Sequence, residues 1–161
     1  MALHLPQVAA ALPGPGDVPA GWEPSGKPRR ESSGDDGRIA YATAGFQAPD
    51  LDGAVGFTIS SYTTTADAIA RFTVLKSQYG STVDPITMAG TEQAFAAKGC
   101  VTENFCSGTI VARTGQAVVT VNINTRDGHA PEPRMLNTAA RMQIERVRQA
   151  QQGHTPTAKA T

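Results

Sequence analysis

The sequence predicts an α+β fold, an antiparallel sheet of about five strands with two helices packed against it, in the order ββα-βββα. Several short segments alternate apolar residues with small or polar ones, a pattern typical of strands. Two longer segments repeat apolar residues every three or four positions, which indicates helices with one buried face. Gly and Pro residues separate these segments and predict the turns between them.

The first half of the domain is expected to contain two strands and a helix. Residues 39–44 and 54–62 are the predicted strands, and 49–53 carries the Pro, Asp and Gly of a turn. The helix is expected to begin after Thr64, whose hydroxyl and the carboxylate three positions later resemble a capping box. One apolar face follows at helical spacing: Ile69, Phe72, Leu75 and Tyr79. Gly80 then supplies a residue suited to a left-handed C-cap.

The second half is expected to add three strands and a longer helix. A strand is predicted at 91–98, and a hairpin at 108–113 and 117–124 turns at Thr114-Gly115. The helix is predicted over 133–151. Its first residue can be Pro133, because proline is tolerated in the first turn of a helix. Its buried stripe is predicted from the helical spacing: Leu136, Ala140, Ile144 and Val147. Its solvated side is predicted from charge: Arg141, Arg146 and Arg148.

The composition divides the chain into three parts. Residues 1–37 are rich in Pro and Gly and are expected to form a leader of local turns without a regular helix. Residues 38–151 are expected to form a single domain, and 152–161 a small, polar, disordered tail. Trp22 lies in the leader, and we expect its ring to pack against the edge of the domain.

Charge and hydropathy restrict the partners. The chain has 14 basic and 14 acidic residues, so we expect no nucleic-acid or membrane-surface binding. No run of 18 apolar residues occurs, so no membrane span is expected. The N-terminus also lacks a basic stretch followed by an apolar one, so we expect no signal peptide. The chain is then either cytoplasmic as it stands or a mature segment of an exported protein.

Two cysteines bear on that choice. Cys100 and Cys106 are separated by five residues, a spacing that matches neither a zinc knuckle nor a redox Cys-x-x-Cys pair. They are either two unrelated buried thiols or a disulfide that closes a short loop, and we favour the disulfide. Because disulfides persist in oxidising compartments, a disulfide implies an extracytoplasmic location.

Catalytic signatures are missing from the sequence. His4, His129 and His154 lie in tails or a loop at no metal-ligand spacing, and we expect no metal site. No nucleophile elbow, phosphate loop or dinucleotide fingerprint occurs, so we predict no cofactor and no enzymatic activity. An enzyme using Asp, Asn and Arg side chains is the weakest hypothesis.

A binding surface is predicted at the last strand. Thr120, Asn122 and Asn124 share its polar face, and Arg126 and Asp127 continue the row of hydrogen-bonding side chains. The alternative interpretation is an ordinary solvated strand face. We expect the ligand to be a small molecule, a cell-wall fragment or a protein, and the sequence does not identify it. The alternative function is that of an immunity or inhibitor subunit, which docks on a partner protein through a flat sheet face.

Several short segments resemble a known group of proteins: Pro19-Ala20-Gly21-Trp22, Thr91-Glu92-Gln93-Ala94-Phe95, the two cysteines, and the hairpin at 109–121. They are similar to secreted actinobacterial lipoproteins and to the extracellular sensor domain of actinobacterial serine/threonine kinases, over residues 12–150. A PsbP-like lipoprotein fold is a fainter likeness. The resemblance implies a non-catalytic extracytoplasmic α+β domain that senses or binds a ligand in a cleft. The chain departs from it in having one cysteine pair and no lipobox cysteine.

Overall fold

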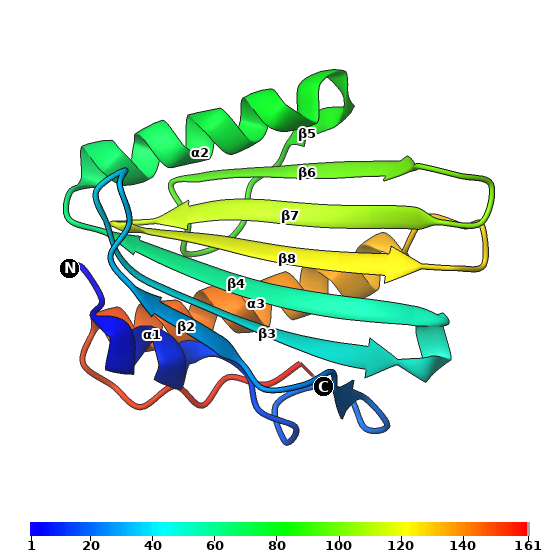
Figure 1. Cartoon of the computed structure of the whole chain (residues 1–161), viewed down its shortest axis with the longest axis horizontal. Coiled ribbons are helices and arrows are strands. Elements are labelled where there is room, and N and C mark those ends of the chain that lie inside the picture. The colour runs from blue at the N-terminus through cyan, green and yellow to red at the C-terminus, as the bar shows by residue number, and fades with distance from the viewer. Residues whose placement is uncertain (161) are drawn as a thin grey trace.

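The computed structural model describes residues 1–160, which form one antiparallel sheet with helices on both faces (Figure 1). The helices are α1 (Leu5–Ala11), α2 (Thr65–Tyr79) and α3 (Pro133–Gln151). The strands are β1 (Glu23–Pro24), β2 (Arg29–Ser32), β3 (Arg38–Ala48), β4 (Gly53–Tyr62), β5 (Val83–Pro85), β6 (Gln93–Cys100), β7 (Cys106–Thr114) and β8 (Ala117–Thr125).

The strands are arranged in the order β1-β3-β4-β8-β7-β6-β5, and β2 pairs with the same edge of β3 as β1 does. Five of the pairings join neighbours in sequence: β2–β3, β3–β4, β5–β6, β6–β7 and β7–β8. The β4–β8 pairing joins the two halves of the chain and places Phe57 opposite Val121. The long central strands are therefore held together by one long-range strand pairing, β4–β8, and by pairings between strands that are close in sequence.

One face of the sheet is covered by α3 and α1. The predicted apolar stripe of α3 is buried, and it packs with the inward side chains of β4 and β8, such as Ile59, Val119 and Val121. The first helix adds Val8 and Ala11 to the same core. Alternation along the strands explains this arrangement, because every second residue of β4 and β8 points to that face.

Helix α2 packs on the opposite face. Thr64 caps it as predicted, since its hydroxyl accepts a hydrogen bond from the Asp67 amide at 3.1 Å. Phe72 lies edge-on to Phe95 of β6, with ring centroids 5.3 Å apart. Gly80 follows the helix as the predicted C-cap glycine with a positive φ of 59°, but its ψ of -130° lies outside the left-handed α conformation that the sequence predicted. This second, smaller core covers only the part of the face formed by β6, β7, the start of β8 and the last residue of β4, Tyr62.

The predicted count of about five strands and two helices is too low, since the sheet has eight strands and the described residues form three helices. The predicted α+β class and antiparallel pairing are confirmed. The missed strands β1, β2 and β5 have two to four residues, and β1 and β5 contain proline. Strands this short have no alternating pattern to recognise, and their place is set by the edges of longer strands.

The expectation that residues 1–37 contain no regular helix is wrong. Proline at the second position of α1 costs no hydrogen bond, because the first amides of a helix have no partner within it. The prediction for Trp22 is confirmed: its side chain is buried, and its indole nitrogen donates to Asp50 Oδ1 at 2.9 Å. The leader thus supplies part of the core rather than only turns.

Residues 152–160 also differ from the predicted disordered tail, while residue 161 lies outside the described residues. The amide of Thr157 donates to Gln149 Oε1 at 2.8 Å, and the amide of Ala160 donates to the Asp17 carbonyl at 2.7 Å. Ala160 itself is 1% exposed. The short polar residues of this segment show no pattern that predicts its packing. The segment forms no helix or strand and is instead held by contacts with α3 and with the leader. That 38–151 is a domain by itself stays a prediction.

Candidate functional site

The three predicted strand residues Thr120, Asn122 and Asn124 lie on one face of β8, the face opposite α1 and α3. Each is partly exposed, and their neighbours Val121 and Ile123 are buried on the other side. The alternation along the strand predicted this much. Figure 1 is seen from this side, so α1 and α3 lie behind the strands, and no helix lies over β3, β4 and most of β8.

Adjacent strands extend this row of polar side chains. Thr58 of β4 is the register partner of Thr120, and Thr43 of β3 is the partner of Thr58. The hydroxyls of Thr43 and Thr58 are 3.1 Å apart, and Asn122 Nδ2 donates to Thr109 Oγ1 on β7 at 2.6 Å. Sequence reasoning missed Thr43, Thr58 and Thr109, because only the strand order brings them beside β8.

We call this surface the open face. Its residues come from β3, β4, β7 and β8: Thr43, Gly45, Gln47, Ala54, Gly56, Thr58, Ser107, Thr109, Thr120, Asn122 and Asn124. They are small residues or neutral hydrogen-bonding residues, with no charged side chain and no large apolar one. A Cβ added at Gly56 would meet nothing within 4 Å, so a ligand has room to approach the backbone there.

Charged residues begin at the borders of the open face. On one side β2 carries Arg29 and Glu31, which form an ion pair at 2.9 Å. Glu31 also lies 3.5 Å from Arg38, so this border is a small network of paired charges. The neutral area is therefore confined to the surface above β3, β4, β8 and the adjoining part of β7.

The other two predicted site residues lie beyond the end of β8. Arg126 is exposed, and its amide donates to the Asp52 carbonyl at 3.0 Å, which joins the loop after β8 to the turn after β3. Asp127 Oδ1 accepts a hydrogen bond from the His129 amide at 2.9 Å. The structure thus gives the loop residue Asp127 a local structural role and does not bring it into the hydrogen-bonded row of Thr and Asn residues.

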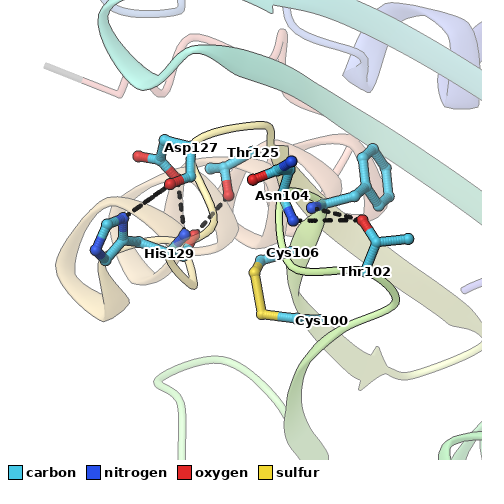
Figure 2. The surroundings of a disulfide bond; sticks show 8 residues. Cys100, Thr102, Asn104, Cys106, Thr125, Asp127 and His129 are labelled. Atoms are coloured by element: carbon cyan, nitrogen blue, oxygen red, sulfur yellow. Dashed lines mark hydrogen bonds and ion pairs between the residues drawn. A yellow bond between two sulfur atoms is a disulfide. The ribbon is translucent and has the colours of Figure 1, made fainter.

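A disulfide closes the loop next to the open face (Figure 2). It joins the register partners Cys100 and Cys106, as the sequence predicted. Inside the loop, Thr102 Oγ1 accepts a hydrogen bond from the Phe105 amide at 3.1 Å. Gly128 packs closely on this loop: a Cβ there would approach the Glu103 carbonyl oxygen to 2.6 Å. The two loops that end β6 and β8 therefore support each other.

Removing the disulfide with a double substitution, Cys100→Ala and Cys106→Ala, is expected to lower the free energy of unfolding by about 2 kcal/mol, the loop-entropy value for so short a loop. Urea unfolding of the wild type with and without reductant measures the same quantity. Alkylation of the native protein, followed by intact mass, should add no label before reduction. Immediate alkylation of both thiols would contradict the disulfide.

Other kinds of site have little support. Within residues 1–160, no three His, Cys, Asp or Glu side chains are placed to hold a metal ion. The described helices include none long and apolar enough to cross a membrane. His129 has a side chain that is 86% exposed and lies beside Asp127.

Comparison with known proteins shows a similarity in structure but none in sequence. No family model matches the chain, and no curated protein matches it by sequence. Among solved structures, the extracellular domain of PknH from Mycobacterium tuberculosis superposes with a TM-score of 0.67 at 12% sequence identity. The alignment covers 94% of this chain and 98% of that domain. The chain therefore has the same fold as this extracellular domain, over nearly its whole length.

Proposed function

We propose that this protein is a non-catalytic extracytoplasmic binding module that recognises a neutral glycan of the cell wall through its open face. The observation that carries the proposal is the chemistry of that face. Solvated protein surfaces are usually rich in Lys, Glu, Arg and Asp. A sheet face that has only Thr, Asn, Gln, Ser and small residues instead presents fixed hydrogen-bond donors and acceptors without charge.

A glycan fits this surface better than a protein does. Protein interfaces obtain most of their binding energy from buried Trp, Tyr and Arg side chains, and the open face as defined has none of them. Tyr41, two residues before Thr43 on the same face of β3, lies at its border under the Arg38 guanidinium, which is 4.9 Å from the ring centroid. A sugar chain offers hydroxyl and amide groups that pair with Asn and Thr side chains. Gly56 leaves the backbone accessible, because a Cβ there would meet nothing within 4 Å, and this favours a ligand that lies flat on the sheet.

Two observations support an extracytoplasmic location. The Cys100–Cys106 disulfide is typical of oxidising compartments. The fold is also that of an extracellular domain. The resemblance to secreted lipoproteins and to kinase sensor domains further suggests that the module is the soluble part of a larger or anchored protein.

The test is binding to neutral oligosaccharides, with tetramers of N-acetylglucosamine, glucose and mannose as probes. Replacing Asn122 and Asn124 together with alanine removes two hydrogen-bonding groups, each worth about 1 kcal/mol, so affinity should fall about 30-fold. The control is Gln78→Ala on α2, an exposed amide far from the face. Equal affinity for the double variant and the wild type would contradict the proposal, as would a failure of the wild type to bind any of the oligosaccharides.

A second variant separates binding from stability. Gly56→Val places a branched side chain in the open space above β4. Because β-branched residues suit strands, we expect unchanged or slightly higher stability. The same side chain blocks close approach to the backbone and should weaken oligosaccharide binding at least as much as the loss of both asparagines. Titration and thermal unfolding of one sample measure both effects.

A protein partner is the second candidate, and the disulfide loop favours it. Val101 is 82% exposed and Phe105 39% exposed, so two apolar side chains project from a loop that the disulfide holds rigid. In that case a photo-cross-linker at position 101 should trap a defined partner from the native host. The trapped product should disappear in the Phe105→Ser variant, while a cross-linker at Gln78 traps nothing.

A further inference from the structure

A pocket lies on the side of the sheet opposite the open face, between the start of α3 and strands β5, β6 and β7. Its volume is about 280 Å³. Small residues of the sheet, Ala96 and Gly108, contribute to its lining, together with the apolar side chains of Ile86, Ile110 and Leu136. It is thus an apolar cavity at the edge of the main core, and neither the glycan proposal nor the loop accounts for it.

Small residues create this pocket. The next residue after Ala96 on the same face of β6 is Lys98, so no bulky apolar side chain follows it there. Gly108 is the diagonal neighbour of Ala96 on β7. A Cβ at Gly108 would lie 3.2 Å from Leu136 Cδ2, so the glycine lets the first turn of α3 approach the sheet. The helix begins at Pro133 and does not extend over β5 and β6. The space beside Leu136 therefore stays open.

Two opposite charges stand at the rim. Lys98 lies two residues after Ala96 on β6 and on the same face, and Asp84 of β5 is the register partner of Ala96. Both line the pocket. Neither forms an ion pair with another residue in 1–160. An unpaired cation and an unpaired anion thus flank one apolar cavity.

We propose that this pocket binds an apolar α-amino acid of about the size of leucine in its zwitterionic form. The apolar side chain occupies the space between Ile86, Ile110 and Leu136. The ligand's carboxylate faces Lys98 and its ammonium group faces Asp84. The volume is just below that of pockets for drug-sized molecules, which matches a ligand of amino-acid size.

The two opposite charges at the rim of the pocket, Lys98 and Asp84, distinguish between classes of ligand. A fatty acid would satisfy Lys98 but place its carboxylate near Asp84, where like charges repel. An alkyl amine has the opposite conflict with Lys98. Only a ligand that carries both charged groups on one carbon atom meets both residues, and burial of its side chain then adds about 0.8 kcal/mol for each CH₂ group.

The experiment is calorimetric titration of the full chain with leucine, leucinamide, N-acetyl-leucine, hexanoate and hexylamine. Leucine should bind saturably, and each derivative that lacks one charge should bind about fivefold more weakly, the size of a solvent-exposed charge pair. Lys98→Met should abolish the difference between leucine and leucinamide, and Asp84→Asn the difference between leucine and N-acetyl-leucine. The matched controls Lys76→Met and Asp35→Asn should preserve both differences.

A pocket-filling variant completes the test. Ala96→Leu should remove leucine binding while the unfolding temperature stays close to that of the wild type, which shows that the fold is intact. The Asn122 and Asn124 variants should bind leucine normally, so failure of this proposal and failure of the glycan proposal are distinguishable. Absence of saturable leucine binding to the wild type overturns the proposal. Hexanoate or hexylamine binding as tightly as leucine overturns the assignment of a zwitterion.

Discussion

Replacing Arg146 with methionine is expected to lower the free energy of unfolding by about 3 kcal/mol, the low end of the range for breaking a buried ion pair. Arg146 of α3 is 5% exposed, and Nη1 lies 3.1 Å from Asp17 Oδ2. Asp17 keeps some contact with solvent, which limits the loss. Methionine fills similar space but leaves the carboxylate without its partner.

The guanidinium also holds the end of α1. Its Nε donates to the Ala11 carbonyl at 3.1 Å, and Nη2 donates to the carbonyls of Ala10 and Leu12. Carbonyls at the end of a helix have no partner within it, so Arg146 serves as a C-cap supplied from another helix. Burial lowers the pKa of Arg146, and the negative charge of Asp17 opposes that shift.

Urea unfolding followed by circular dichroism measures this prediction. The matched control is Arg141→Met on the same helix, where the side chain is exposed and the cost should stay within about 0.5 kcal/mol. Nη1 of Arg146 also donates to the Ala158 carbonyl at 3.1 Å, so the variant should expose both the leader and the C-terminal segment to protease. Equal stability of the two variants would show that the leader is not held by Arg146.

The interior elements were predictable because their patterns are local. Strand β4 shows an alternating apolar pattern, α2 has a capping residue and a terminal glycine, and β7–β8 is a hairpin around Gly115. Each of these signals lies within about a dozen residues of chain. The prediction therefore recovered the elements around which the sheet is built, and its antiparallel class.

Arg146 shows what the sequence did not reveal. Its charge placed it on the predicted solvated side of α3, which is wrong, because α1 packs against that side and buries it. Whether a charged helix residue is buried depends on a segment more than 130 positions away. Arg141 is exposed as predicted, so charge alone does not distinguish the two residues.

The candidate site was likewise predictable where it depends on a local pattern and not where it depends on long-range contacts. Alternation in β8 placed Thr120, Asn122 and Asn124 on one face, while the contribution of Thr43 and Thr58 depends on the long-range pairing of β4 with β8. A loop after a strand has no alternation to extend. The predicted continuation into Arg126 and Asp127 therefore rested on sequence order alone, and a role for either in ligand binding stays a prediction.

The alanine substitution of Gly53 is expected to destabilise the protein by about 3 kcal/mol, the upper part of the range for overpacking. Gly53 begins β4 opposite Thr125, and a Cβ there would overlap the carbonyl oxygen of Asn124. That oxygen belongs to the backbone, so relief requires the strands to separate. Asn124 would move with its backbone, and oligosaccharide affinity should fall together with stability.

Gly56→Ala in the same strand is the matched control. Its Cβ would meet nothing within 4 Å, and alanine is favoured over glycine in a strand by about 0.5 kcal/mol, so stability should be equal or slightly higher. Thermal unfolding of both variants gives the comparison of stability, and oligosaccharide titration is made on Gly53→Ala and the wild type. If both lose the same stability, the loss reflects glycine's flexibility rather than the contact with Asn124. If only Gly53→Ala loses stability, the overlap with the Asn124 carbonyl is the cause, and the β4–β8 pairing at this end depends on a glycine at position 53.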